Sequence, residues 1–126
     1  MSHAAISFPD FVDSLREPSS HTSLSASRLA EALELPAQEL AALARVHRNT
    51  LQAAPTSFKL QSAMRDVVRA LSAAYALCGD IDRALFWFRN HPIPEFGHRT
   101  AIDLVAAGKV DAVVDYVESL SAGFTG

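Results

Sequence analysis

The strongest hydrophobic pattern in the chain runs from residue 58 to residue 78. Apolar side chains recur there every three or four residues, which is the repeat of one face of an α-helix. They are Leu60, Met64, Val67, Val68, Leu71, Ala74, Tyr75 and Cys78. We therefore expect one long helix whose stripe, Cys78 included, lies in the core, and we expect Gly79 to end it in a left-handed conformation.

Shorter hydrophobic patterns precede this helix. They predict three helices, over residues 25–35, 36–44 and 47–53. Pro36 separates the first two, because proline interrupts a helix and fits the first turn of the next one. The second and third are joined by a short turn at Arg45-Val46.

Three further helices are predicted behind the long one. The first begins after Asp80, and its inner stripe is Ile81, Ala84, Leu85 and Phe88. Two prolines and a glycine predict a loop over residues 91–98. Thr100 and Asp103 then match a capping box, with Asp where Glu is usual, so we expect a helix over residues 101–107. The last helix is expected over residues 110–120.

The pattern as a whole predicts an all-α protein in three parts. Residues 1–23 form an N-terminal arm with room for one short amphipathic helix, residues 24–57 form a helix-turn-helix unit, and residues 58–126 form a helical C-terminal domain. No segment shows the alternation of a half-buried strand.

Composition narrows the function classes. The chain has 126 residues, 49% of them hydrophobic, and a net charge of −3, so it can build a core and does not bind nucleic acid through its bulk charge. Its one cysteine excludes an internal disulfide framework, and the spacing of its five histidines predicts no metal site. We expect no cofactor. With no membrane span or signal peptide in the pattern, we expect a soluble cytoplasmic protein.

The turn at Arg45-Val46 has the features of a DNA-binding helix-turn-helix. Ala41 is small enough for two helices to approach closely, and Val46 and Leu51 are apolar where the crossing has to be fixed. Arg, Asn and Gln side chains make bidentate contacts with base edges, and Thr contacts phosphate or the thymine methyl group. The candidate DNA-binding residues are Arg45, His47, Arg48, Asn49, Thr50, Gln52 and Lys59.

Local charge supports this interpretation. Residues 40–69 contain five basic residues and one acidic residue, a local charge of +4 in an acidic chain. Against it, Arg45 stands where such turns often have Gly, and a non-Gly residue in a left-handed conformation costs about 1 kcal/mol. The alternative is an ordinary three-helix packing unit with a solvated polar turn.

The C-terminal domain shows no catalytic pattern. Arg99-Thr100 at a helix start fits an anion, since helix N-termini offer free N–H groups, but capping by Thr100 is the simpler explanation. His91 and His98 flank a loop and are expected on the surface. We therefore do not expect an enzyme.

Two apolar features have no place in the predicted core. Phe86 and Trp87 lie off the inner stripe of their helix, and we expect part of this surface to form a homodimer. The tail, residues 121–126, is small and flexible apart from Phe124. It fits either insertion of an aromatic anchor into a partner's cleft or a frayed end.

The C-terminal half carries a resemblance to a known family. Residues 84–104 read ALFWFRNHPIPEFGHRTAIDL, in which an aromatic-rich helix leads into a proline loop and then a helix start with Arg and Asp-Leu. This resembles the Xre/MbcA/ParS-type antitoxins, in which such a toxin-binding domain follows a helix-turn-helix. The run departs from the family pattern in having His91 between Asn90 and Pro92, and Ala101 in place of Pro.

The resemblance implies a specific function. Such antitoxins bind and inhibit RES-domain toxins that degrade NAD or transfer ADP-ribose, and they repress their own operon as dimers. Here it implies that residues 58–126 dimerise and bind the toxin, and that the partners are the toxin of the same operon, operator DNA and a second copy. The implied toxin-binding residues are Arg99, Thr100, Asp103, Tyr116, Leu120, Gly123 and Phe124. The alternative is a helix-turn-helix regulator whose C-terminal domain dimerises or senses a ligand, with no toxin partner.

Overall fold

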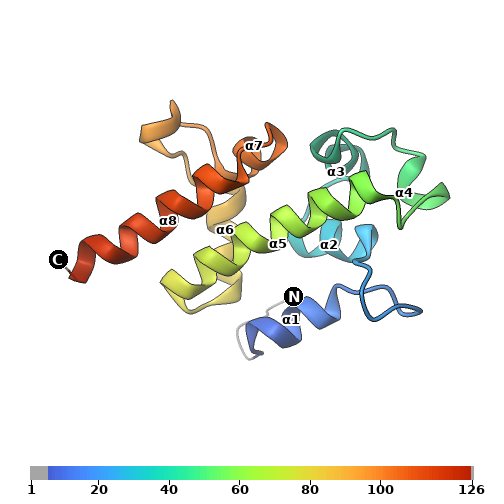
Figure 1. Ribbon diagram of the computed structural model, residues 1–126, viewed down its shortest axis with the longest axis horizontal. Coiled ribbons are helices and arrows are strands. Elements are labelled where there is room, and N and C mark those ends of the chain that lie inside the picture. Colours follow the sequence, from blue (N-terminus) through green and yellow to red (C-terminus); the bar gives the residue numbers. More distant parts are fainter. Residues whose placement is uncertain (1–5, 126) are drawn as a thin grey trace. The chain divides into compact units, whose positions relative to one another are not determined.

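The computed structural model describes residues 6–125, and their side chains up to residue 122. The regular elements of this part of the chain are all helices, with no strand, which confirms the all-α prediction (Figure 1). Its elements are α1 (Phe8–Ser14), α2 (Ala26–Leu33), α3 (Ala37–Ala44), α4 (Thr50–Ala53), α5 (Phe58–Cys78), α6 (Ile81–Asn90), the 3-10 helix η1 (Pro94–Phe96), α7 (Ala101–Ala106) and α8 (Val110–Thr125).

The chain divides into two compact units. The N-terminal unit comprises Ile6–Asp66, and the C-terminal unit comprises the described residues from Val67 onward. The division falls inside α5, whereas the sequence analysis places the domain boundary before this helix. As expected, α5 is followed by Gly79 in a left-handed conformation, with a φ of 71°.

The N-terminal unit is built around α2 and α3, which pack on each other. The segment expected to be an arm contributes to this core, because Phe11 of α1 and Leu15 are almost completely buried. The other large buried side chains of the unit are Leu24, Leu29, Leu33, Leu40, Leu43, Leu60 and Met64.

One buried polar side chain ties three segments of this unit together. Gln61 in α5 is 5% exposed. Its side-chain oxygen accepts from the backbone N–H of Leu24 at 2.9 Å, and its amide donates to the carbonyls of Leu24 and Pro55, both at 2.9 Å. Gln61 therefore holds the entry to α2 and the exit from α4 against α5.

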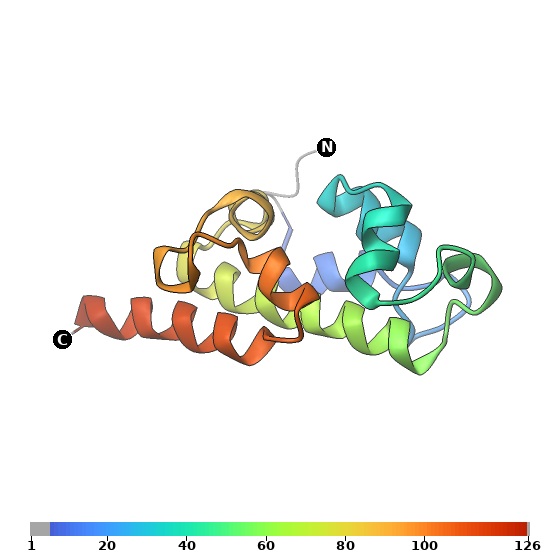
Figure 2. The same cartoon turned by 90° about the horizontal axis from the view of Figure 1, so that it is seen from above.

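The C-terminal unit contains α6, α7 and α8, in which α7 packs against both of the others (Figure 2). The inner stripe predicted for α6 is confirmed, since all four of its side chains are buried. Asp80 caps this helix as predicted, because its side chain accepts from the backbone N–H of Arg83 at 2.9 Å. The remaining core consists of Ile93, Ala101, Leu104, Val105, Val110, Val113, Val114 and Val117.

Two expectations about helix ends are wrong. Cys78 is exposed rather than buried, because α5 continues for one turn past its last buried residue, Ala74. The tail predicted to be flexible after Leu120 is helical, since α8 continues to Thr125. A single Gly inside a helix costs only about 1 kcal/mol, so Gly123 does not end α8.

Candidate functional site

The loop between α6 and α7 is fixed by a buried anchor. Ile93 is completely buried, its N–H donates to the carbonyl of Arg99 at 2.9 Å, and its own carbonyl accepts from the N–H of His98 at 2.9 Å. Gly97 and His98 both have left-handed backbones, with φ of 69° and 66°. This geometry turns the chain sharply, and it leaves His98 exposed as predicted.

The start of α7 is capped as the sequence predicts. The backbone N–H of Asp103 donates to the Thr100 hydroxyl at 3.3 Å, and the backbone N–H of Thr100 donates to the Asp103 carboxylate at 3.1 Å. Both side chains therefore already hold the helix end. Arg99 is exposed, and its Nε donates to the carbonyl of Phe96 at 3.2 Å, so its guanidinium is held close to η1.

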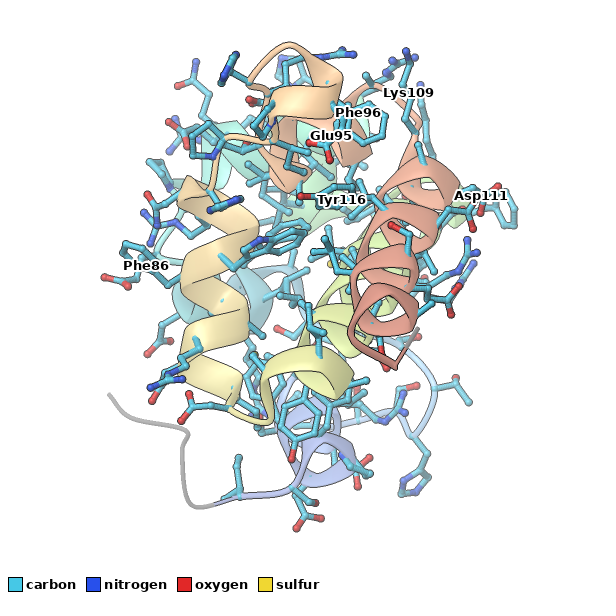
Figure 3. The ribbon with its side chains drawn as sticks, turned by 90° about the vertical axis from the view of Figure 1, so that its left-hand side faces the viewer. Phe86, Glu95, Phe96, Lys109, Asp111 and Tyr116 are labelled. Atoms are coloured by element: carbon cyan, nitrogen blue, oxygen red, sulfur yellow. The ribbon has the colours of Figure 1, made fainter. Side chains whose placement is uncertain are left out.

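An aromatic pair joins this loop to α8. The rings of Phe96 and Tyr116 meet edge to face, with centroids 6.1 Å apart and planes at 77°. This is a favoured geometry for two aromatic rings. Burial, and to a lesser extent the Glu95 carboxylate, raise the pKa of Tyr116, so its phenol stays protonated at neutral pH and keeps a hydrogen-bond donor. Figure 3 shows Glu95 and Phe96 beside Tyr116. Phe86 projects from α6 at a separate place, away from these three side chains.

The residues that the resemblance implies for toxin binding gather around this pair in part. Tyr116 and Leu120 lie one turn apart on α8, and both are half-buried. Gly123 lies in the last turns of α8, and the side chain of Phe124 lies outside the described residues. Sequence reasoning missed Glu95 and Phe96, because no spacing rule links residue 96 to residue 116.

Comparison with known proteins shows what this region is similar to. Residues 73–123 match the model of the antitoxin Xre/MbcA/ParS C-terminal toxin-binding domain. These residues are therefore similar to the toxin-binding domain of that antitoxin family. The match extends from the second half of α5 into the last turns of α8, and so includes the capped helix and the aromatic pair.

A solved structure supports the same fold. One chain of the crystal structure of the M. tuberculosis MbcT–MbcA toxin–antitoxin complex superposes with a TM-score of 0.57 and 19% sequence identity. The superposition covers 79% of this chain and 92% of that chain, so the likeness of fold extends beyond the antitoxin domain. No curated protein matches the chain.

The predicted DNA-binding segment precedes the antitoxin domain and is less regular than expected. The helix predicted over residues 47–53 begins only at Thr50, because residues 47–49 form a turn. The N–H groups of Thr50 and Leu51 donate to carbonyls three residues earlier, at 2.9 and 3.2 Å, and the N–H of Asn49 donates to the His47 imidazole at 3.1 Å. This local bonding replaces the first turn of the expected helix.

The side chains of this segment face solvent. Thr50 is half-buried, and the other six predicted DNA-binding residues are exposed: Arg45, His47, Arg48, Asn49, Gln52 and Lys59. Arg45 has a φ of 58°, so it occupies the left-handed position for which glycine is preferred.

One arginine of the local basic set is paired elsewhere. Arg69 forms an ion pair with Asp111 at the start of α8, within the C-terminal unit. Both side chains are more than half exposed, so the pair adds at most about 1 kcal/mol to stability. Within the N-terminal unit the basic set is Arg45, Arg48, Lys59 and Arg65.

The described residues show neither a metal site nor a membrane span. Among them, no three His, Cys, Asp or Glu side chains are arranged to hold a metal ion. No helix in this part of the chain has the length and apolar character needed to cross a membrane.

Proposed function

We propose that this chain is the antitoxin of a type II toxin–antitoxin system, and that it binds and inhibits a RES-type toxin that degrades NAD or transfers ADP-ribose. The observation that carries the proposal is the match of residues 73–123 to an antitoxin toxin-binding domain. The antitoxin acts by covering its partner rather than by catalysing a reaction, so it needs no cofactor.

In this proposal the toxin binds where the loop after α6 meets α8. Arg99, Tyr116 and Leu120 offer a cation, a phenol and an apolar side chain on this surface. Thr100 and Asp103 act by fixing the start of α7. The end of α8 extends the surface and carries Phe124 into the toxin's NAD cleft, where burying its ring contributes about 2 kcal/mol.

Deleting residues 122–126 tests the role of this end. The truncation removes the last turn of α8 without touching the buried valines of that helix, so folding should be unchanged. We expect the truncated protein to retain part of its toxin affinity and to lose more of its inhibition, measured as NAD consumption by toxin saturated with antitoxin. Phe124→Ala should reproduce the loss, and Leu77→Ala, at an exposed position of α5, should not. Full inhibition by the truncated protein would assign inhibition to the remaining helical surface alone.

We further propose that the antitoxin represses its own operon as a homodimer that binds operator DNA. The exposed basic and polar residues around the α3–α4 turn support this second activity. A dimer supplies two such segments to a two-fold operator. Phe86, which is 68% exposed on α6, is the apolar side chain that we assign to the dimer contact. Light scattering that gives only a monomer at tens of micromolar protein would contradict the dimer.

Arg48→Ala tests the DNA interface. If Arg48 reads a base edge, the substitution should weaken operator binding by about 1–3 kcal/mol, and wild-type affinity should fall steeply with salt. Arg83→Ala is the charge-matched control, because Arg83 is exposed in the C-terminal unit. Equal mobility shifts for both variants and the wild type would exclude this segment from DNA recognition. A regulator without a toxin partner is the second candidate, and a neighbouring RES-type gene distinguishes the two.

A further inference from the structure

The cluster of Glu95, Phe96 and Tyr116 combines a free carboxylate with aromatic surface. Phe96 and Tyr116 are each half-buried, so part of each ring remains accessible to a partner. Glu95 is exposed at the centre of η1, and its charge reaches Tyr116, which it helps to keep protonated. Figure 3 shows the three side chains together, where η1 lies beside α8.

No described residue forms an ion pair with Glu95. Arg99 is the basic residue nearest in sequence, and its Nε is directed to the backbone carbonyl of Phe96. The cluster is therefore an acidic group beside accessible aromatic rings, which is the chemistry that attracts a guanidinium or ammonium group.

Four other acidic residues of this unit lack one part of this combination. Asp103 is used in the capping box, and Asp111 is paired with Arg69. Asp115 and Glu118 are exposed on α8, one residue before and two residues after Tyr116, and these spacings place them on other faces of the helix. They carry the same charge without the rings and so provide matched controls.

We propose that Glu95, Phe96 and Tyr116 form a receptor for one arginine or lysine side chain of the toxin. The inference rests on the proposed antitoxin function and specifies the partner surface, which must present a basic side chain at this point. The cation stacks on the aromatic surface while the Glu95 carboxylate accepts its hydrogen bonds. The phenol of Tyr116 is neutral and leaves the charge balance of the pair unchanged.

The experiment measures toxin affinity by calorimetry, with the full chain and the purified product of the neighbouring toxin gene, at low and at high salt. Glu95→Gln removes the charge and keeps the size, and we expect about tenfold weaker binding at low salt and a smaller loss at high salt. Tyr116→Leu removes the ring, and we expect a loss of about 3- to 30-fold. Tyr116→Phe keeps the ring and should bind within about twofold of the wild type. Glu118→Gln is the control for bulk charge and should leave affinity unchanged.

A double variant distinguishes whether Glu95 and Tyr116 bind the same cation or contact the toxin independently. If Glu95 and Tyr116 hold the same cation, the loss in the Glu95→Gln, Tyr116→Leu double variant is smaller than the product of the two single losses. The folding control is the melting temperature of each variant, which should equal that of the wild type.

Three results would overturn the proposal. Wild-type affinity in both Glu95→Gln and Tyr116→Leu would exclude the cluster from the interface while leaving the antitoxin function intact. An equal loss in Glu118→Gln would show that only bulk charge matters. A wild-type chain that does not bind the toxin at all would overturn both the receptor and the proposed function.

Discussion

Two helix starts in this protein look alike in sequence and differ in construction. Both α4 and α7 are short helices that follow a polar loop and begin with Thr50 and Ala101, respectively. The start of α7 is closed by a reciprocal capping box, and the loop before it is anchored by completely buried Ile93. The start of α4 has no side-chain cap, and α4 contains no buried residue.

The difference shows which surface the fold makes rigid. The loop before α7 has a fixed shape because its backbone bonds and its buried side chain belong to the C-terminal unit itself. The segment around α4 packs on α3, and at its far end Gln61 donates a hydrogen bond to the carbonyl of Pro55. A rigid surface suits the toxin contact that we propose, whereas the uncapped segment suits the proposed contact with DNA, in which the ligand can add order.

Removing the anchor of the rigid loop should have the largest effect. Ile93→Ala leaves a cavity at a completely buried position, so we expect the free energy of unfolding to fall by about 2–5 kcal/mol. Toxin binding should fall as well, because the loop no longer positions Phe96. Chemical denaturation measures the first effect, with Leu77→Ala as the control at a position that is 39% exposed. Equal losses of stability in the two variants would show that Ile93 does not anchor the loop.

Removing the hydrogen bonds of Gln61 should have the next largest effect on stability. Gln61→Leu fills similar space but leaves buried backbone groups of Leu24 and Pro55 without their partners. We expect a loss of about 1–3 kcal/mol in the free energy of unfolding. Gln52→Leu is the matched control, because Gln52 is exposed. Wild-type stability of Gln61→Leu would mean that water replaces these bonds.

Substitutions at the N-cap positions of α7 and α4 test the difference between the two helix starts directly. Thr100→Ala should destabilise the protein by about 0.5–2 kcal/mol, because it removes the hydroxyl that caps α7. Thr100→Ser should be close to the wild type. Asn49→Ala at the equivalent position of α4 should cost almost nothing, since the Asn49 side chain forms no capping bond. If thermal unfolding gave Asn49→Ala the larger loss, the contrast between the two helix starts would be wrong.

Relieving the backbone strain at Arg45, in the turn before α4, should have the smallest effect on stability. This effect should be a gain rather than a loss. Arg45→Gly removes the strain of a left-handed arginine, partly offset by the greater freedom of glycine in the unfolded chain. We expect a gain of at most about 1 kcal/mol in stability, together with weaker DNA binding because a cation is lost. Glu34→Gly, at another left-handed position with a φ of 55°, should give a similar gain without affecting DNA binding. A loss of stability in both variants would contradict the claim that these two left-handed residues are strained.

The sequence predicted most helices of this fold because their signals are local. The stripe of α6, the Asp80 cap, the capping box of α7 and the left-handed Gly79 all follow from spacing within a few residues. The same reasoning failed where the outcome depends on distant packing. Phe11 and Leu15 are buried although they lie in the segment predicted to be an arm, and Cys78 is exposed although it continues the apolar stripe of α5.

The candidate site was predictable only in part for the same reason. Thr100 and Asp103 follow from a motif, and the resemblance points to Tyr116 and Leu120. The contact between Phe96 and Tyr116 joins residues twenty positions apart. That contact depends on the path of the loop around Ile93, which local spacing does not encode.

The central claim is that this chain inhibits a toxin by covering its active site. The direct measurement is NAD consumption by the purified toxin of the neighbouring gene, titrated with the full-length chain. The account predicts that activity falls to zero as the complex forms, and that Ile93→Ala shifts the titration to much higher antitoxin concentrations. Full toxin activity in a saturated complex, or no complex at all, would contradict it.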